Sequence, residues 1–274
     1  MSFSGHTARK RFGQHWLKDG SVLDRIVAAA ELSPSDCVLE VGPGRGALTG
    51  RLLGTAVAQV HAVELDRDLV AGLQERFGGD PRFSLQSGDV LDLPVLGDPS
   101  RPANKVVANI PYNITGPLLE RLVGRLDRPV DPPYQRLVLL VQQEVAQRIS
   151  APPGHSSFSA LSVRMQLLAR CRSVCPVPPR CFQPPPKVQS EVIALEPLPA
   201  CERLAPSLAK TVERLLRQAF QARRKMVRNT LATLAPSQGL EPWLAEASVE
   251  PQQRPQDLSP QHWVALAAAL APAP

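Results

Sequence analysis

Four strand-like runs in the first 110 residues each lead into a glycine, an acid or an amide, and this pattern restricts the folds open to the chain. The runs are residues 37–41, 60–64, 83–86 and 105–108, and segments with helical periodicity separate them. Such alternation predicts an α/β fold with a mostly parallel sheet, because parallel strands need a crossover connection. A continuous apolar run at 137–141 is typical of a further, fully buried strand.

The polar residues at the strand ends recur at a regular spacing. Gly42, Glu64, Asp89 and Asn109 lie 22, 25 and 20 residues apart. The carboxyl ends of neighbouring parallel strands line one crevice, which is where such sheets bind ligands. We therefore expect these four residues to share a binding site.

The residue types at these positions indicate the kind of ligand. The Gly-Pro-Gly-Arg-Gly turn at 42–46 lets the backbone approach a ligand closely. Glu64 can accept hydrogen bonds from two ribose hydroxyls, and Asp89 can accept one from an adenine amine. A nicotinamide dinucleotide is the competing interpretation, but the glycine spacing is G-x-G-x-G and not the G-x-G-x-x-G of the pyrophosphate cradle. The pattern favours a ligand that contains adenosine and no diphosphate.

The composition changes near residue 200. Residues 175–199 hold eight of the 29 prolines and bracket a last predicted strand at 188–195. From residue 204 onward the periodicity is wholly helical. We therefore predict an α/β domain over residues 1–199, whose first 18 residues form a basic segment, and a helical domain over 200–274.

The charge balance favours a polyanionic partner such as nucleic acid, since 31 Lys and Arg oppose 25 Asp and Glu and give a net charge of +6. Five basic residues recur at helical intervals and would form one phosphate-binding stripe if the helix continued through Ala222. These residues are Lys210, Arg214, Arg217, Arg224 and Arg228.

Several classes of protein are disfavoured. No run of 18 apolar residues occurs, which argues against a membrane span. The five cysteines are odd in number and no secretory signal precedes them, so we expect reduced thiols and a cytoplasmic protein. The cysteines form no C-x-x-C pair, so we expect no metal site.

Five motifs together resemble one enzyme family. Residues 40–46 look like the first motif of S-adenosylmethionine-dependent methyltransferases, and residues 109–114, Asn-Ile-Pro-Tyr-Asn-Ile, look like the amine-methylating motif of RNA adenine dimethyltransferases. Residues 11–17, 182–188 and 219–231 narrow the likeness to the KsgA (RsmA) type of small-subunit rRNA adenine N6,N6-dimethyltransferases. The likeness runs from about Arg9 to the C-terminal helices.

The resemblance implies a Rossmann-like class I methyltransferase domain followed by a small helical domain. It implies S-adenosylmethionine as cofactor and no metal. Carried over by position, the cofactor contacts are His15, Leu17, Gly42, Gly44, Glu64, Asp89 and Asn109. Many family members have asparagine where this chain has His15. Asp66 and Asp68 are better explained as charges that start a helix than as ligands.

The resemblance also implies how the reaction proceeds. The Asn109 side-chain oxygen and the Ile110 carbonyl would accept the two hydrogens of the target amine and direct its lone pair at the methyl group. Pro111 would fix the chain direction. Tyr112 would stack on an adenine drawn out of its duplex, and Phe182 would form the second aromatic wall.

The implied substrate is the 16S rRNA of a small-subunit precursor, dimethylated at two adjacent adenosines near its 3′ end during 30S biogenesis by a monomeric enzyme. The implied RNA contacts are Arg9, Lys10, Arg11, Lys187, Arg223, Arg224, Lys225 and Arg228. Two alternatives stay open: a 23S rRNA methylase of the macrolide-resistance type, and a factor that acts chiefly as a checkpoint in ribosome assembly.

Overall fold

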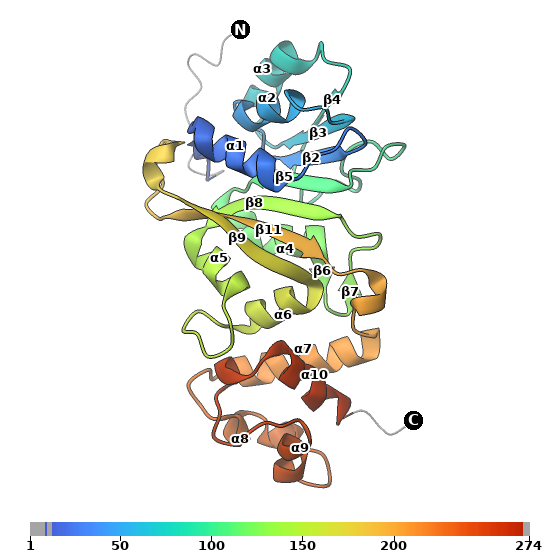
Figure 1. Cartoon of the computed structure of the whole chain (residues 1–274), viewed down its shortest axis with the longest axis vertical. Helices are drawn as coiled ribbons and strands as arrows, with labels where there is room; N and C mark the ends of the chain where they lie inside the picture. The colour runs from blue at the N-terminus through green and yellow to red at the C-terminus, as the bar shows by residue number, and fades with distance from the viewer. Residues whose placement is uncertain (1–8, 10–12, 271–274) are drawn as a thin grey trace. The chain divides into compact units, whose positions relative to one another are not determined.

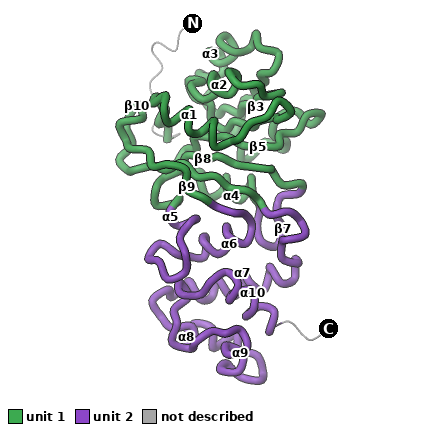
Figure 2. Tube along the Cα trace, in the orientation of Figure 1, with its two compact units in different colours: residues 1–123, 132–146, 172–197 green, residues 124–131, 147–171, 198–274 purple. Residues whose placement is uncertain are grey.

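The computed structural model describes residue 9 and residues 13–270. The chain divides into two compact units, shown in green and purple in Figure 2. Unit 1 comprises Met1–Val123, Pro132–Ala146 and Arg172–Pro197. Unit 2 comprises Gly124–Asp131, Gln147–Cys171 and Leu198–Pro274.

A seven-stranded sheet organises the first part of the chain (Figure 1). Its strands, in spatial order, are β4 (Phe83–Ser87), β3 (Gln59–Glu64), β2 (Cys37–Val41), β5 (Lys105–Asn109), β8 (Arg136–Gln142), β11 (Ser190–Pro197) and β9 (Ala169–Val177). The pairs from β4 to β8 are parallel, whereas β8 and β11 are antiparallel. The predicted α/β fold with a mostly parallel sheet is confirmed.

The helices of unit 1 cover the sheet because one side of each is apolar. They are α1 (Gly20–Ala29), α2 (Ala47–Leu53), α3 (Arg67–Phe77) and α4 (Thr115–Val123), with α5 (Gln143–Ser150) starting at the end of β8. Alternate residues along β3, β8 and β11, together with Val38 of β2, share one core cluster with α1 and α2. A strand side chain therefore faces either this core or the opposite face of the sheet.

Two short ladders lie outside the main sheet. In unit 1, β1 (Trp16–Leu17) pairs with β10 (Phe182–Gln183), so that Leu17 lies opposite Phe182 and Trp16 opposite Gln183. In unit 2, β6 (Gly124–Arg125) pairs with β7 (Arg128–Pro129). The β1–β10 ladder brings a segment before the first helix together with one from the proline-dense region.

After Pro197 all described secondary structure is helical, as the periodicity predicts. The α-helices of unit 2 are α6 (Ala160–Leu168), α7 (Pro206–Phe220), α8 (Val227–Thr230), α9 (Leu240–Glu246) and α10 (Pro260–Ala268). The apolar face of α7 is buried, and Phe220 at its end lies 5.8 Å from the ring of Trp263 on α10.

The prediction that five basic residues between Lys210 and Arg228 form one stripe on a continuous helix is wrong for its last two members. Helix α7 ends at Phe220 and turns occupy the next residues, so Arg224 and Arg228 do not continue its face. Lys210, Arg214 and Arg217 do share an exposed side of α7. No separate helix was predicted at α5, α6 or α9 and no strand at β9, although the residues of α5 have a clear helical period.

Candidate active site

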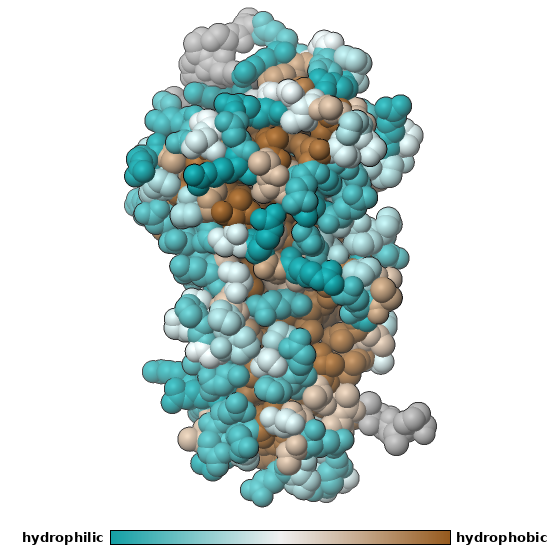
Figure 3. Space-filling model, in the orientation of Figure 1, coloured by the Kyte–Doolittle hydropathy of each residue, from teal (hydrophilic) through white to brown (hydrophobic). Residues whose placement is uncertain are grey.

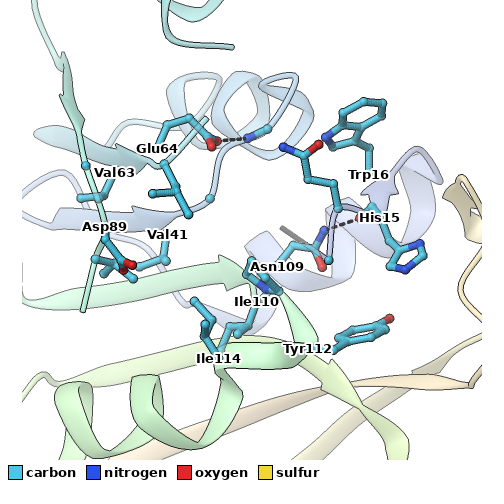
Figure 4. A pocket seen from close by; sticks show the side chains of 18 residues that line it. His15, Trp16, Val41, Val63, Glu64, Asp89, Asn109, Ile110, Tyr112 and Ile114 are labelled. Carbon is cyan, nitrogen blue, oxygen red and sulfur yellow. Dashed lines mark hydrogen bonds between the residues drawn. The ribbon is translucent and has the colours of Figure 1, made fainter. Parts of the chain in front are cut away.

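A cavity lies at the carboxyl edge of the parallel strands, within unit 1 (Figure 4). The strand-end residues that the spacing singled out all line it. Its lining comprises Gly13, Gln14, His15, Trp16, Val41, Gly42, Gly44, Val63, Glu64, Leu65, Gly88, Asp89, Val90, Asn109, Ile110, Pro111, Tyr112 and Ile114. The structure therefore brings Gly42, Glu64, Asp89 and Asn109 together around one cavity.

The glycine turn follows β2 directly and is tied to the neighbouring strand. The Gly42 N–H donates to the Val63 carbonyl at 2.9 Å, and Gly42 and Gly44 have φ values of +68° and +58°. A Cβ built on Gly44 would lie 2.8 Å from Trp16 Cδ1. A Cβ on Gly42 would meet only Asn109 O and Pro111 Cδ, both at 3.9 Å, so its absence keeps the space above the loop open.

Glu64 ends β3 and is buried, and both of its carboxyl oxygens accept backbone hydrogen bonds. The Gly44 N–H donates to Oε2 at 3.0 Å, and the Asp66 N–H donates to Oε1 at 2.8 Å. Burial raises the pKa of Glu64, while the two N–H donors act against that rise. Each oxygen retains a further acceptor position.

The segment after β5 carries the second set of functional groups. Asn109 Nδ2 donates to the main-chain oxygen of His15 at 3.0 Å, which turns Oδ1 away from that bond (Figure 4). Tyr112 Oη lies 2.5 Å from Ser190 Oγ. Burial raises the pKa of Tyr112, so its phenol is protonated at neutral pH.

Two predicted contacts lie elsewhere. Leu17 is buried in the core and lines a neighbouring cavity together with Gly42 and Asn109. Phe182 is 1% exposed and belongs to the core cluster, and it does not line the cavity beside Tyr112. Its pairing opposite Leu17 in the β1–β10 ladder explains this, because directly opposed residues of a ladder point to the same face.

Several residues of the site were not predicted. Leu65 and Val90 each follow a predicted acid and add apolar wall to the cavity, and Leu65 is 44% exposed. The sequence signal that could have identified Leu65 and Val90 is an apolar residue directly after an acid at the end of a strand. Trp16 packs against Gly44, and the guanidinium of Arg45 lies 3.9 Å from the Trp16 ring.

The predicted RNA contacts differ in their surroundings. Arg9 pairs with Asp66 at 2.9 Å and with Asp68, and Asp66 caps α3, which confirms the interpretation of both acids as helix-start charges. Lys10 and Arg11 lie outside the described residues. Arg223 donates to Gln256 and to the Ser156 carbonyl. The remaining predicted contacts are exposed: Lys187, Arg224, Lys225 and Arg228.

The described residues form neither a metal-binding cluster nor a membrane-spanning helix. They contain no group of three or more His, Cys, Asp or Glu residues placed to hold a metal ion. None of the helices they form is long and apolar enough to span a membrane.

The sequence profile of the family described as "Ribosomal RNA adenine dimethylase" matches residues 5–271, nearly the whole chain. The chain belongs to this family. It is therefore an rRNA adenine dimethyltransferase that depends on S-adenosylmethionine.

Named relatives of this dimethylase match along its full length. It is 77% identical over 273 residues to "Ribosomal RNA small subunit methyltransferase A" of Synechococcus sp. (strain RCC307), with 100% of both chains covered. It is 73% identical over 270 residues to the protein of the same name from Parasynechococcus marenigrum (strain WH8102), covering 98% of this chain and 89% of that one.

Solved structures share the fold. A dimethyladenosine transferase from Plasmodium falciparum has a TM-score of 0.78 and 27% identity, with 92% of this chain and 96% of that one covered. The 23S rRNA methyltransferase ErmE has a TM-score of 0.74 and 28% identity, with 93% of this chain and 99% of that one covered. The class I methyltransferase fold expected from the resemblance is confirmed.

Proposed function

We propose that this dimethylase transfers methyl groups from S-adenosylmethionine to N6 of two adjacent adenosines near the 3′ end of 16S rRNA. The substrate is the precursor of the small ribosomal subunit, in the cytoplasm, and the enzyme acts as a monomer. The observation that carries the proposal is the 77% identity, over the whole chain, to a protein named as a small subunit methyltransferase.

The residues of the cavity suit the cofactor. Glu64 keeps an acceptor position on each carboxyl oxygen for the ribose hydroxyls, and half-buried Asp89 offers an acceptor to the adenine amine. The open space over Gly42 leaves room for a ligand next to the loop. When bound, S-adenosylmethionine supplies a methyl group on a positively charged sulfur, and no metal is part of the proposal.

The residues after β5 are suited to hold the N6 amine of the target adenosine. Since Asn109 Nδ2 is occupied by the His15 carbonyl, the side-chain oxygen is the group left to accept a hydrogen from the target N6. The Ile110 carbonyl would accept the other hydrogen. Two acceptors hold the amine with its lone pair toward the methyl group and stabilise the positive charge that develops on nitrogen.

The target base must leave its stack to reach these acceptors. Tyr112 provides a half-buried ring at the required place, and its hydrogen bond with Ser190 limits the rotation of the ring. Base–aromatic stacking compensates for stacking lost in the RNA.

The helical segment 200–274 is proposed to bind the ribosomal particle. Within unit 2, Arg224, Lys225 and Arg228 are exposed cations in and just after the turn that follows α7. Lys210, Arg214 and Arg217 add a row of exposed cations on α7 itself. Such groups suit RNA phosphates because their binding releases counterions.

The competing substrate is the large subunit, since ErmE has the same fold. The test is transfer of labelled methyl from S-adenosylmethionine to undermodified small and large subunits in separate reactions. We expect label in the small subunit only, in dimethyladenosine at two neighbouring positions identified by mass spectrometry. Label confined to the large subunit would overturn the assignment.

A further inference from the structure

The turn that begins at Asp89 determines where the carboxylate of that residue lies. Asp89 Oδ1 accepts the Leu91 N–H at 2.8 Å, and the Asp89 main-chain oxygen accepts the Leu93 N–H at 3.0 Å. Because the turn itself uses Oδ1, the other carboxyl oxygen, Oδ2, is the one left for a ligand. The direction of the carboxylate therefore depends on the positions of Leu91 and Leu93.

Arg121 of α4 holds the same two leucines from the other side. Its Nη1 donates to the Leu91 carbonyl at 3.2 Å, and its Nη2 donates to the Leu93 carbonyl. Each leucine thus bonds to Asp89 through its N–H and to Arg121 through its carbonyl. A guanidinium is a rigid planar fork, so its two bonds fix the spacing of the two carbonyls.

Helix α4 gives Arg121 a fixed base. The helix is packed into unit 1 through four buried apolar side chains: Leu118, Leu119, Leu122 and Val123. It begins at Thr115, directly after residues 109–114, and the Thr115 hydroxyl donates to the Tyr112 carbonyl at 3.3 Å. One packed helix therefore runs from the segment after β5 to the turn of Asp89.

The rest of the connection between β4 and β5 is fastened separately. It contains no helix, and side chains of the sheet hold it instead. The Gln86 side chain donates to the Val95 carbonyl at 3.2 Å. His61 Nε2 lies 3.0 Å from the Arg101 carbonyl. Removing the Arg121 side chain should therefore loosen the turn and leave the remainder of the connection in place.

We propose that Arg121 is a positioning residue, which sets the direction of the Asp89 carboxylate and thereby the preference for a cofactor with an adenine amine. This rests on the proposed function, in which Asp89 accepts a hydrogen bond from that amine. Arg121 does not line the strand-end cavity, so it acts through Leu91 and Leu93.

The test compares two ligands that differ in the group that Asp89 would bind. S-adenosylhomocysteine carries the adenine amine, and S-inosylhomocysteine has a carbonyl oxygen in its place. A site built to accept a hydrogen bond from the amine rejects the analogue that lacks it. We therefore expect the wild type to bind S-adenosylhomocysteine more tightly, with both dissociation constants measured by calorimetry.

Arg121→Met keeps most of the length of the side chain and removes its donors. We expect it to raise the dissociation constant of S-adenosylhomocysteine roughly twofold to 30-fold, the range of coupling through residues that do not touch the ligand. It should bind S-inosylhomocysteine no more weakly than the wild type does. Arg121→Lys keeps a charged donor and should lie between the two, and it gives the same comparison if Arg121→Met does not fold.

Arg82→Met is the matched control. Arg82 forms the same kind of fork, donating to the Leu53 carbonyl at 2.7 Å and to the Thr55 carbonyl at 2.9 Å. It precedes β4, at the end of the strand away from Asp89, and does not line the cavity. We expect this variant to have a lower melting temperature and the preference of the wild type between the two ligands.

A double variant tests whether Arg121 acts through Asp89. Asp89→Ala removes the acceptor, so adding Arg121→Met to it should change the dissociation constant of S-adenosylhomocysteine by less than about twofold.

Three results would overturn the proposal: an unchanged preference in Arg121→Met, an equal loss of affinity for both ligands in that variant, or the same loss of preference in Arg82→Met. Failure of the proposed function is distinguishable, because the wild type would then transfer no methyl to small subunits whatever the two dissociation constants are.

Discussion

At the scale of single residues, the site depends on the orientation of the side-chain amide of Asn109. Asn109 donates through Nδ2 to the His15 carbonyl, so its oxygen is the group available to the substrate. The orientation is determined by a residue 94 positions away in the chain. No local pattern around Asn109 could reveal it.

Asn109→Ala should separate chemistry from binding. We expect kcat to fall by a factor of roughly 100 to 1,000, as when one oriented hydrogen-bonding group is removed from a developing charge. Binding to the small subunit, measured by co-sedimentation, should stay within about twofold. Loss of both would mean that Asn109 is structural, and retained methyl transfer would remove its proposed role.

Glu40 offers a second test at this scale. It is 1% exposed on β2, beside the hydroxyl and the main-chain N–H of Thr49, which favour the charged carboxylate. Burial raises its pKa to about 8, and the nearby charge of Glu64 adds to the rise. The unfolded chain ionises this group near its ordinary pKa of 4.5, whereas the folded protein keeps the proton up to about pH 8.

Glu40 therefore costs stability as the pH rises from about 4.5 to about 8, because the folded state then binds more protons than the unfolded state. Glu40→Gln removes this titration. We expect the variant to gain free energy of unfolding relative to the wild type between pH 5 and pH 8, on the order of a few kcal/mol. Urea unfolding of both proteins at pH 5 and pH 8 measures their free energies of unfolding. If the variant and the wild type differed by the same amount at the two pH values, the raised pKa of Glu40 would be contradicted.

At the scale of elements, the strands were easier to predict than the helices of unit 2. The strands β2, β3 and β5 coincide with their predicted runs to within one residue at each end, because buried parallel strands are continuous apolar runs. The end of α7 was misjudged because nothing in the residues after Phe220 forbids another helical turn.

The arginines in and after the turn that follows α7 differ in whether they are bonded within unit 2 or exposed. Arg223 holds Gln256 and the Ser156 carbonyl within unit 2, whereas Arg224 and Arg228 are exposed. We expect the double variant Arg224→Ala with Arg228→Ala to bind the small subunit more weakly. The slope of the logarithm of its binding constant against the logarithm of salt concentration should become less steep by about 2. Arg223→Ala should instead lower the melting temperature. A double variant with an unchanged salt slope would exclude phosphate contact.

At the scale of the whole molecule, the fold does not distinguish between the two ribosomal subunits as substrate. A 23S rRNA methyltransferase shares the architecture at a TM-score of 0.74. Discrimination must lie in surface residues, and hydrophilic side chains cover much of the face shown in Figure 3. Among the described residues, the large exposed apolar side chains are Leu65, Val95 and Val188, and two of these line cavities.

The sequence by itself predicted the parallel strands of the sheet and the position of Gly42, Glu64, Asp89 and Asn109 at their carboxyl edge. These follow from local rules: a parallel strand is a run of neighbouring residues, and its end must lie at one edge of the sheet. Only the tertiary structure decided that Phe182 is core and that His15 faces Tyr112. Both depend on the pairing of β1 with β10, about 165 residues apart, and no periodicity within either segment encodes that register.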